Sequence, residues 1–276
     1  SKENKLTSPD GKISVELQAD SSSVLRYIVK YGDNIILEPS ALGLMLSDAD
    51  YTNLEVVAVS NKREVSGSYT TPAEKRLNNS FKANEWDVTV KNKDGKEMKI
   101  TFHLANNGVA FRYVFEEQTT DEKTIEKEIT SFKFPATTKA WLHPHDDVKN
   151  CWAQTCPSYE DNYITDIPVG TQAPKKAGWS FPALYKSNEA WVLITEAGLE
   201  PPYCGTRLAQ YSPDGEYFIE FPQKGETVKP DDPITPISKL PLNSPWRVIM
   251  LGELSDIVEN SMVTDVSEPS RIENID

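Results

Sequence analysis

Cysteine and histidine are scarce in this chain, with three of each among 276 residues. Cys151 and Cys156 in CWAQTC are close enough to bridge, but their spacing matches no standard zinc pattern. Together with Cys204 they make an odd number, so the thiols do not settle the redox compartment. The sequence also lacks a G-x-S-x-G elbow, a cysteine with a plausible His–Asn arrangement and a glycine-rich phosphate loop. A stand-alone nucleophilic enzyme therefore has little support.

Positive charge is also in short supply, with 29 Lys and Arg against 42 Asp and Glu and a net charge of −13. This balance disfavours binding to nucleic acid or to an anionic membrane surface. It suits a neutral ligand or a cation. No apolar run approaches the ~20 residues that span a bilayer. The opening SKENKLTSPDG has no apolar core of a signal peptide, so we expect that any secretion signal was removed earlier or never existed.

Helical periodicity is rare, and alternation is common. The segment 86–115 is the clearest case, because apolar residues alternate on either side of Asp94-Gly95 and again after Asn107-Gly108. These patterns predict three sequential antiparallel strands. A short helix is predicted near 254–262, with Ser255 as its N-cap. The chain is thus expected to be all-β, a large antiparallel β-sandwich over residues 1–276 with at most one or two short helices.

Two polar stretches stand out from the strands. Residues 169–180 form the best candidate for a long irregular loop, where binding groups usually lie. His143 and His145, followed by Asp146 and Asp147, could ligate zinc, although no third imidazole is near and polar loops of this kind are common.

Several stretches together resemble one known family. They are SPDGKISVEL, NNGVAFRYVF, WVLITEAGLEPPYCGTRL, SPWRVIMLGEL and VSEPSRIENID. In order and spacing they resemble the N-terminal domain of glycoside hydrolase family 97, the α-glucosidases and α-galactosidases. The resemblance spans essentially the whole chain, although no single piece is diagnostic.

The resemblance implies a β-supersandwich of the galactose-mutarotase type, followed in the family by a catalytic (β/α)₈ barrel. It implies hydrolysis of α-glycosidic bonds in oligosaccharides ending in glucose or galactose, by inversion or by retention. Barrels place their catalytic groups on their own loops, so no catalytic residue is expected within 1–276. We therefore expect this fragment alone to be inactive. A periplasmic or secreted location is implied as well.

Glu196 is the residue that the resemblance singles out for a metal. In the family a glutamate of the N-terminal domain joins barrel carboxylates around calcium, and ITEAG carries Glu196 at that place. Glu200 is the rival ligand. Calcium takes six to eight oxygen ligands, so one carboxylate cannot hold it tightly and the isolated domain is expected to lack a strong site. Pairing of Glu196 with a cation of its own chain, far from exposed apolar surface, would argue against this role.

Three further residues are candidates for substrate binding or barrel contact: Trp179, Tyr203 and Arg207. Tyr203 could stack on a sugar and Arg207 could pair with a hydroxyl or a carboxylate. Trp179 is open to three roles, as a sugar platform, a domain contact or a core residue. The alternative function is a stand-alone carbohydrate-binding, lectin-like sandwich that uses Trp152, Trp179 and Tyr203. An adhesin-like structural sandwich is a third possibility.

Overall fold

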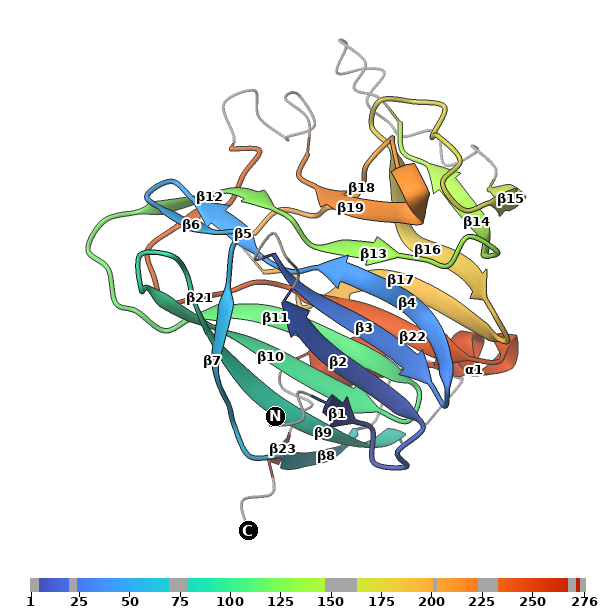
Figure 1. The fold of residues 1–276 in the computed structure, drawn as a ribbon, viewed down its shortest axis with the longest axis horizontal. Helices are drawn as coiled ribbons and strands as arrows, with labels where there is room; N and C mark the ends of the chain where they lie inside the picture. The colour runs from blue at the N-terminus through green and yellow to red at the C-terminus, as the bar shows by residue number, and fades with distance from the viewer. Residues whose placement is uncertain are drawn as a thin grey trace.

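Antiparallel strands make up nearly all the regular structure of the computed structural model (Figure 1). The structure describes residues 5–19, 24–69, 79–146, 163–200, 203–222, 233–267 and 272–273. The first strands are β1 (Lys5–Thr7), β2 (Ile13–Ala19), β3 (Leu25–Tyr31), β4 (Asn34–Ala41), β5 (Leu44–Leu46), β6 (Ala49–Tyr51), β7 (Glu55–Val59), β8 (Arg63–Tyr69), β9 (Asn79–Lys91), β10 (Glu97–Ala105) and β11 (Gly108–Phe115). The later strands are β12 (Lys123–Glu128), β13 (Ser131–Lys133), β14 (Lys139–Pro144), β15 (Ile164–Pro168), β16 (Trp179–Ser187), β17 (Ala190–Ala197), β18 (Arg207–Leu208), β19 (Glu216–Glu220), β20 (Ile237–Ser238), β21 (Leu242–Asn243), β22 (Trp246–Gly252) and β23 (Ile272–Glu273).

The strands form two layers of one continuous, curled sheet. In one layer β1, β2, β3 and β4 pair in sequence, and β13, β19 and β18 extend it. In the other layer the order runs β9, β10, β11, β22, β17, β16 and β14. Pairing of β16 with β18 joins the layers, and Figure 1 shows β2, β3 and β4 lying across β10, β11 and β22. A smaller sheet contains β20, β12, β5 and β6.

The main core fills the space between the layers. Alternating residues supply it, so that Ile13, Val15 and Leu17 of β2 face the other layer. The predicted strands over 86–115 are confirmed as β9, β10 and β11, which pair in antiparallel order. The all-β antiparallel sandwich is thus confirmed.

A second, smaller core lies on the outer face of the second layer, beneath the C-terminal helices. The helices are α1 (Leu254–Glu259) and α2 (Met262–Val266), and Pro213–Gly215 forms a 3₁₀ turn. Ile257 and Met262 pack there with Trp246 and Val248. Neither α-helix in the described ranges is long or apolar enough to cross a membrane.

Two local predictions are corrected. The helix N-cap is Glu253 and not Ser255, because Glu253 and Asp256 close a reciprocal capping box. The second hairpin turns at Asn106-Asn107, and Gly108 already pairs with Ala105 as the first residue of β11. Glycine is needed at 108 because a Cβ would lie 2.4 Å from the Ile249 carbonyl oxygen.

Candidate functional site

Glu196 lies at the end of β17, directly opposite Arg247 of β22 in the antiparallel register. Arg247 Nη1 donates to Glu196 Oε2 at 2.9 Å. Arg247 alternates with Ile249 and Leu251 of the main core, and its side chain has 0% exposure, against 15% for Glu196. The ion pair therefore lies at the edge of the space between the layers, with Glu196 toward solvent.

A second carboxylate holds the other side of the Arg247 guanidinium. Glu128, the last residue of β12, accepts from Arg247 Nε at Oε1 (3.1 Å) and from Nη2 at Oε2 (2.5 Å). Glu128 is itself buried. Such a two-point fork fixes the plane of the guanidinium. Burial alone would lower the pKa of Arg247, but the charge and hydrogen bonds of Glu128, together with Tyr203 and Glu196, outweigh it and raise the pKa, so Arg247 stays charged.

Hydroxyl groups donate the remaining hydrogen bonds to Glu128. Tyr203 donates to Oε2 at 3.1 Å and Thr130 to Oε1 at 2.9 Å. The Tyr113 hydroxyl lies 2.6 Å from that of Thr130 and accepts from the Gly43 amide. Burial, and then the charge of Glu128, raise the pKa of Tyr203 and of Tyr113, so both phenols stay protonated. The hydroxyl groups of Tyr203, Thr130 and Tyr113 are therefore neutral members of the network, whereas Arg247 carries a charge.

Glu196 is less completely engaged than Glu128. Its Oε2 accepts from Arg247 and from the Thr206 hydroxyl at 3.0 Å, whereas Oε1 accepts, among the described residues, from the Thr206 amide alone, at 3.2 Å. A Cβ placed on Gly205 would lie 3.6 Å from Oε1 and 3.7 Å from Leu199 Cδ2. Gly205 thus places no side chain against Oε1, and Leu199, on the same side of Gly205, is 47% exposed.

This carboxylate has the chemistry of a calcium ligand but cannot form a complete site. Oε1 keeps lone-pair capacity, and hard oxygen donors are what calcium takes. Among the described residues no group of three or more His, Cys, Asp or Glu could hold a metal. The described residues therefore offer one carboxylate ligand, Glu196, and further ligands would have to come from elsewhere. Glu196 does pair with a cation of its own chain, Arg247, and the exposed apolar residue near this turn is Leu199.

The other predicted residues are mostly buried. Tyr203 belongs to the Glu128 network and is not available to stack on a sugar. Trp179 has 0% exposure and packs in the main core, so of its three open roles the structure places it in the core. Arg207 is buried and donates to the Phe221 carbonyl oxygen. Glu200 is exposed, and its carbonyl oxygen closes a turn with the Tyr203 amide.

Several sequence candidates lie outside the described residues. They are Cys151, Cys156, Trp152 and Asp147. Of the zinc candidates that are described, His145 Nδ1 lies 2.8 Å from the Ser180 hydroxyl, and Asp146 pairs with Lys175. His143 packs edge-on against the Tyr163 ring. Each of these side chains already has a partner within the chain.

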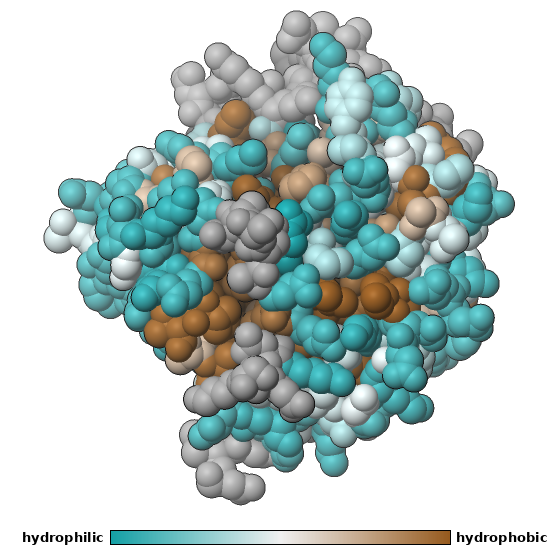
Figure 2. Space-filling view, in the orientation of Figure 1, coloured by the Kyte–Doolittle hydropathy of each residue, from teal (hydrophilic) through white to brown (hydrophobic). Residues whose placement is uncertain are grey.

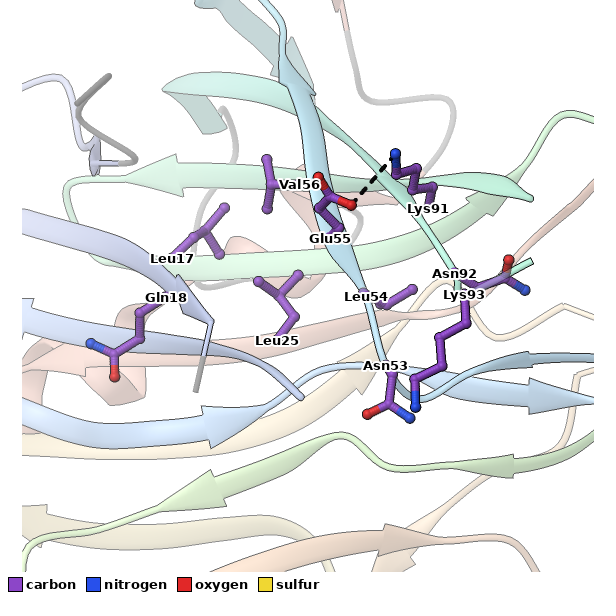
Figure 3. Close-up of a pocket in the computed structure, with 10 residues that line it drawn as sticks. All are labelled: Leu17, Gln18, Leu25, Asn53, Leu54, Glu55, Val56, Lys91, Asn92 and Lys93. Carbon is purple, nitrogen blue, oxygen red and sulfur yellow. Dashed lines mark ion pairs between the residues drawn. The ribbon is translucent and has the colours of Figure 1, made fainter. Parts of the chain in front are cut away.

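A hollow of about 420 Å³ opens between the end of β2, the start of β3 and β7. Figure 3 shows its apolar floor, and Figure 2 shows apolar surface in this region, left of the centre. Its rim carries amides, Lys93 and the Glu55–Lys91 ion pair (3.4 Å). None of its ten described lining residues is aromatic, and none belongs to the Glu196 network. The full set is Leu17, Gln18, Leu25, Asn53, Leu54, Glu55, Val56, Lys91, Asn92 and Lys93.

One aromatic pair on the outer face was not named from the sequence. The rings of Trp141 and Trp191 are half-buried, with centroids 4.8 Å apart. Lys186 lies over the Trp191 ring at 5.4 Å. Trp191 is thus engaged by two neighbours of its own chain, which disfavours it as a sugar platform.

The fold is a large antiparallel β-sandwich of the kind found at the N-terminal part of family 97 glycoside hydrolases. The chain belongs to the glycosyl-hydrolase 97 N-terminal family, whose model matches residues 6–269. A curated relative from Streptomyces bingchenggensis (strain BCW-1), named a probable retaining alpha-galactosidase, is 24% identical over 257 residues. The match covers 93% of this chain and only 36% of that relative.

Solved structures agree on the fold. A beta-arabinopyranosidase matches with a TM-score of 0.83 and 31% identity, over 90% of this chain and 40% of the other. A glycoside hydrolase family 97 enzyme from Pseudoalteromonas sp. strain K8, solved with acarbose, matches with a TM-score of 0.73 and 23% identity, over 93% and 37%. The chain thus spans well under half the length of these proteins, at their glycosyl-hydrolase 97 N-terminal part.

Sequence reasoning missed the two residues that hold Glu196 in place. Arg247 lies 51 positions and Glu128 68 positions away from it in sequence, the differences 247 − 196 and 196 − 128. Only the pairing of β17 with β22, and the end of β12 beside them, brings the three together. The one available signal was the charged Arg247 within the apolar run WRVIML.

Proposed function

We propose that this chain is the N-terminal domain of a calcium-dependent, exo-acting α-glycosidase with α-glucosidase or α-galactosidase activity. It supports a catalytic (β/α)₈ barrel of the same polypeptide. It contributes Glu196 as a calcium ligand and forms part of the substrate pocket wall. The enzyme is periplasmic or secreted.

The observation that carries this proposal is the state of Glu196. Oε2 is held by Arg247 and the Thr206 hydroxyl, whereas Oε1 accepts from the Thr206 amide and has no side chain of residue 205 against it. A carboxylate held in this way can meet a second domain without rearrangement. Family membership and the short coverage of the relatives support the presence of such a domain.

Calcium would supply charge stabilisation at the domain boundary and polarise a sugar oxygen. Within this chain Glu196 would bind the ion, and Arg247 and Thr206 orient that carboxylate. Acid and base catalysis belongs to the barrel.

The test compares residues 1–276 with the product of the complete open reading frame. We expect about 250 further residues with alternating strands and helices. The complete protein should hydrolyse aryl α-glucosides or α-galactosides, lose activity in chelator and regain it with calcium. A β-L-arabinopyranoside belongs in the panel, because it shares the ring configuration of an α-D-galactoside and lacks its hydroxymethyl group.

Glu196→Gln in the complete protein tests the ligand role, with Glu200→Gln as the matched control four residues on. We expect the first change to abolish calcium-induced thermal stabilisation and the second to leave it intact. The proposal fails if residues 1–276 hydrolyse these substrates alone, or if Glu196→Gln binds calcium as the wild type does. Submicromolar calcium affinity of residues 1–276 would also contradict it.

A further inference from the structure

Arg247 is built to hold Glu196 by one oxygen only. Its Nε and Nη2 are committed to Glu128, and Nη1 alone reaches Glu196, at Oε2. The Thr206 hydroxyl lies within hydrogen-bond distance of both Arg247 Nη1 (3.2 Å) and Glu196 Oε2 (3.0 Å). Two of these contacts end at Oε2 and the third joins their donors, so Arg247 and the Thr206 hydroxyl together hold Oε2, while the Thr206 amide donates to Oε1.

Glu128 is a saturated anchor with no role of its own at the surface. Each of its oxygens accepts two hydrogen bonds, from Arg247 and Thr130 at Oε1 and from Arg247 and Tyr203 at Oε2. It is buried, and Arg247 is fully buried. The guanidinium therefore cannot turn to follow Glu196, and Glu196 must adapt to it.

The group is also unbalanced in charge. Among the described residues, the two carboxylates Glu128 and Glu196 form ion pairs with the same guanidinium, that of Arg247. The excess negative charge belongs to Glu196, the member near solvent, because Glu128 is saturated. A cation approaching Oε1 would be attracted by this excess without displacing Arg247 from Oε2.

We propose that Arg247, anchored by Glu128 and assisted by the Thr206 hydroxyl, is a positioning residue that presents Glu196 Oε1 to the cation. This inference rests on the proposed function. It adds that cation affinity depends on a side chain that does not touch the cation. Residues that orient metal ligands in this way typically change metal affinity about 10–100-fold when altered.

Arg247→Lys in the complete protein is the first variant, because it keeps the positive charge and removes the fork. An ammonium lacks the planar fork that matches the two Glu128 oxygens, so it does not fix a third donor toward Glu196. We expect calcium affinity, measured by isothermal titration calorimetry, to fall at least about 10-fold. Arg63→Lys is the matched control, since Arg63 also joins two carboxylates but on the outer face, and should leave affinity unchanged.

Thr206→Val is the second variant and serves if Arg247→Lys does not fold. It removes the hydroxyl that meets Oε2 and keeps the side-chain shape, while the Thr206 amide still donates to Oε1. We expect weaker calcium binding with little change in the melting temperature of the calcium-free protein. Thr206→Ser keeps the hydroxyl and should restore the affinity, an outcome that a purely structural role would not produce.

The outcomes separate the two claims. If Glu196→Gln binds calcium normally, the proposed function is wrong and this inference falls with it. If Glu196→Gln loses calcium but Arg247→Lys and Thr206→Val bind normally, the ligand role stands and positioning by Arg247 is wrong. Tighter calcium binding by Arg247→Lys would also overturn the inference, because it would make Arg247 a competitor for the carboxylate.

Discussion

Two arginine–carboxylate groups lie on opposite faces of the same layer of strands, and they differ in how deeply the arginine is buried. On the inner face Arg247 joins Glu128 and Glu196. On the outer face Arg63 joins Asp87 (2.9 Å) and Glu85 (3.6 Å), and Glu85 also meets His103 at 2.8 Å. The outer group ties β8, β9 and β10 together.

Burial separates the two arginines. The Arg63 side chain is 31% exposed, and that of Arg247 is fully buried. A partly exposed arginine can exchange its carboxylate partners for water, whereas a buried one cannot. The comparison indicates that the outer group contributes to sheet stability, and that the inner group also constrains how Glu196 is presented.

The largest expected effect comes from Arg247→Met in residues 1–276. It leaves Glu128 buried without its cation, and breaking a buried pair in this way costs about 3–5 kcal/mol. Arg63→Met should lose only about 1 kcal/mol, because water can replace the arginine. Urea unfolding of both variants measures the difference. Equal losses would show that the two groups are energetically alike.

A smaller effect is expected from neutralising the carboxylates in turn. Glu128→Gln replaces one of the two carboxylate oxygens that accept from Arg247 with an amide NH₂ group, which is a donor. The free energy of unfolding should therefore fall by about 1–3 kcal/mol. Glu196→Gln should change the unfolding free energy by about 1 kcal/mol or less, since its side chain reaches solvent. The same urea titrations test this order. A greater loss for Glu196→Gln would make Glu196 a structural residue first.

The smallest expected effect is on the pH dependence of stability, through Asp87 of the outer group. Burial alone would raise the pKa of Asp87, but hydrogen bonds from Arg63 and Thr101 outweigh it and lower the pKa. A lowered folded-state pKa stabilises the protein above the unfolded value of about 3.9, and this contribution disappears as pH falls through the folded-state value. Asp87→Asn should therefore be less stable than wild type near neutrality and should match it in strong acid. A difference that persists unchanged in acid would contradict this assignment.

The fold was largely predictable, because it depends on local alternation. Trp86, Val88 and Val90 face one way in sequence and in structure, and the hairpin at Asp94-Gly95 lies where its turn residues predict. Gly108 was placed one position off, because the close approach of the Ile249 carbonyl oxygen, which requires glycine there, is a tertiary fact.

Of the three charged residues of the site, only Glu196 was predicted from the sequence; Arg247 and Glu128 were not. Glu196 was found through the resemblance, but its partners come from β12 and β22 and have no local signature. Tyr203 was named for sugar stacking and instead donates to buried Glu128. Exposure is the property that sequence conveys least well for such residues, since aromatic and arginine side chains are common both in cores and in pockets.

The most direct test of the account is the distance between Glu196 and calcium in a crystal structure of the complete protein with the ion bound. We predict Glu196 Oε1 at about 2.3–2.6 Å from calcium, with Oε2 still hydrogen-bonded to Arg247. A calcium ion more than about 4 Å from both Glu196 oxygens, well outside that coordination range, would contradict it.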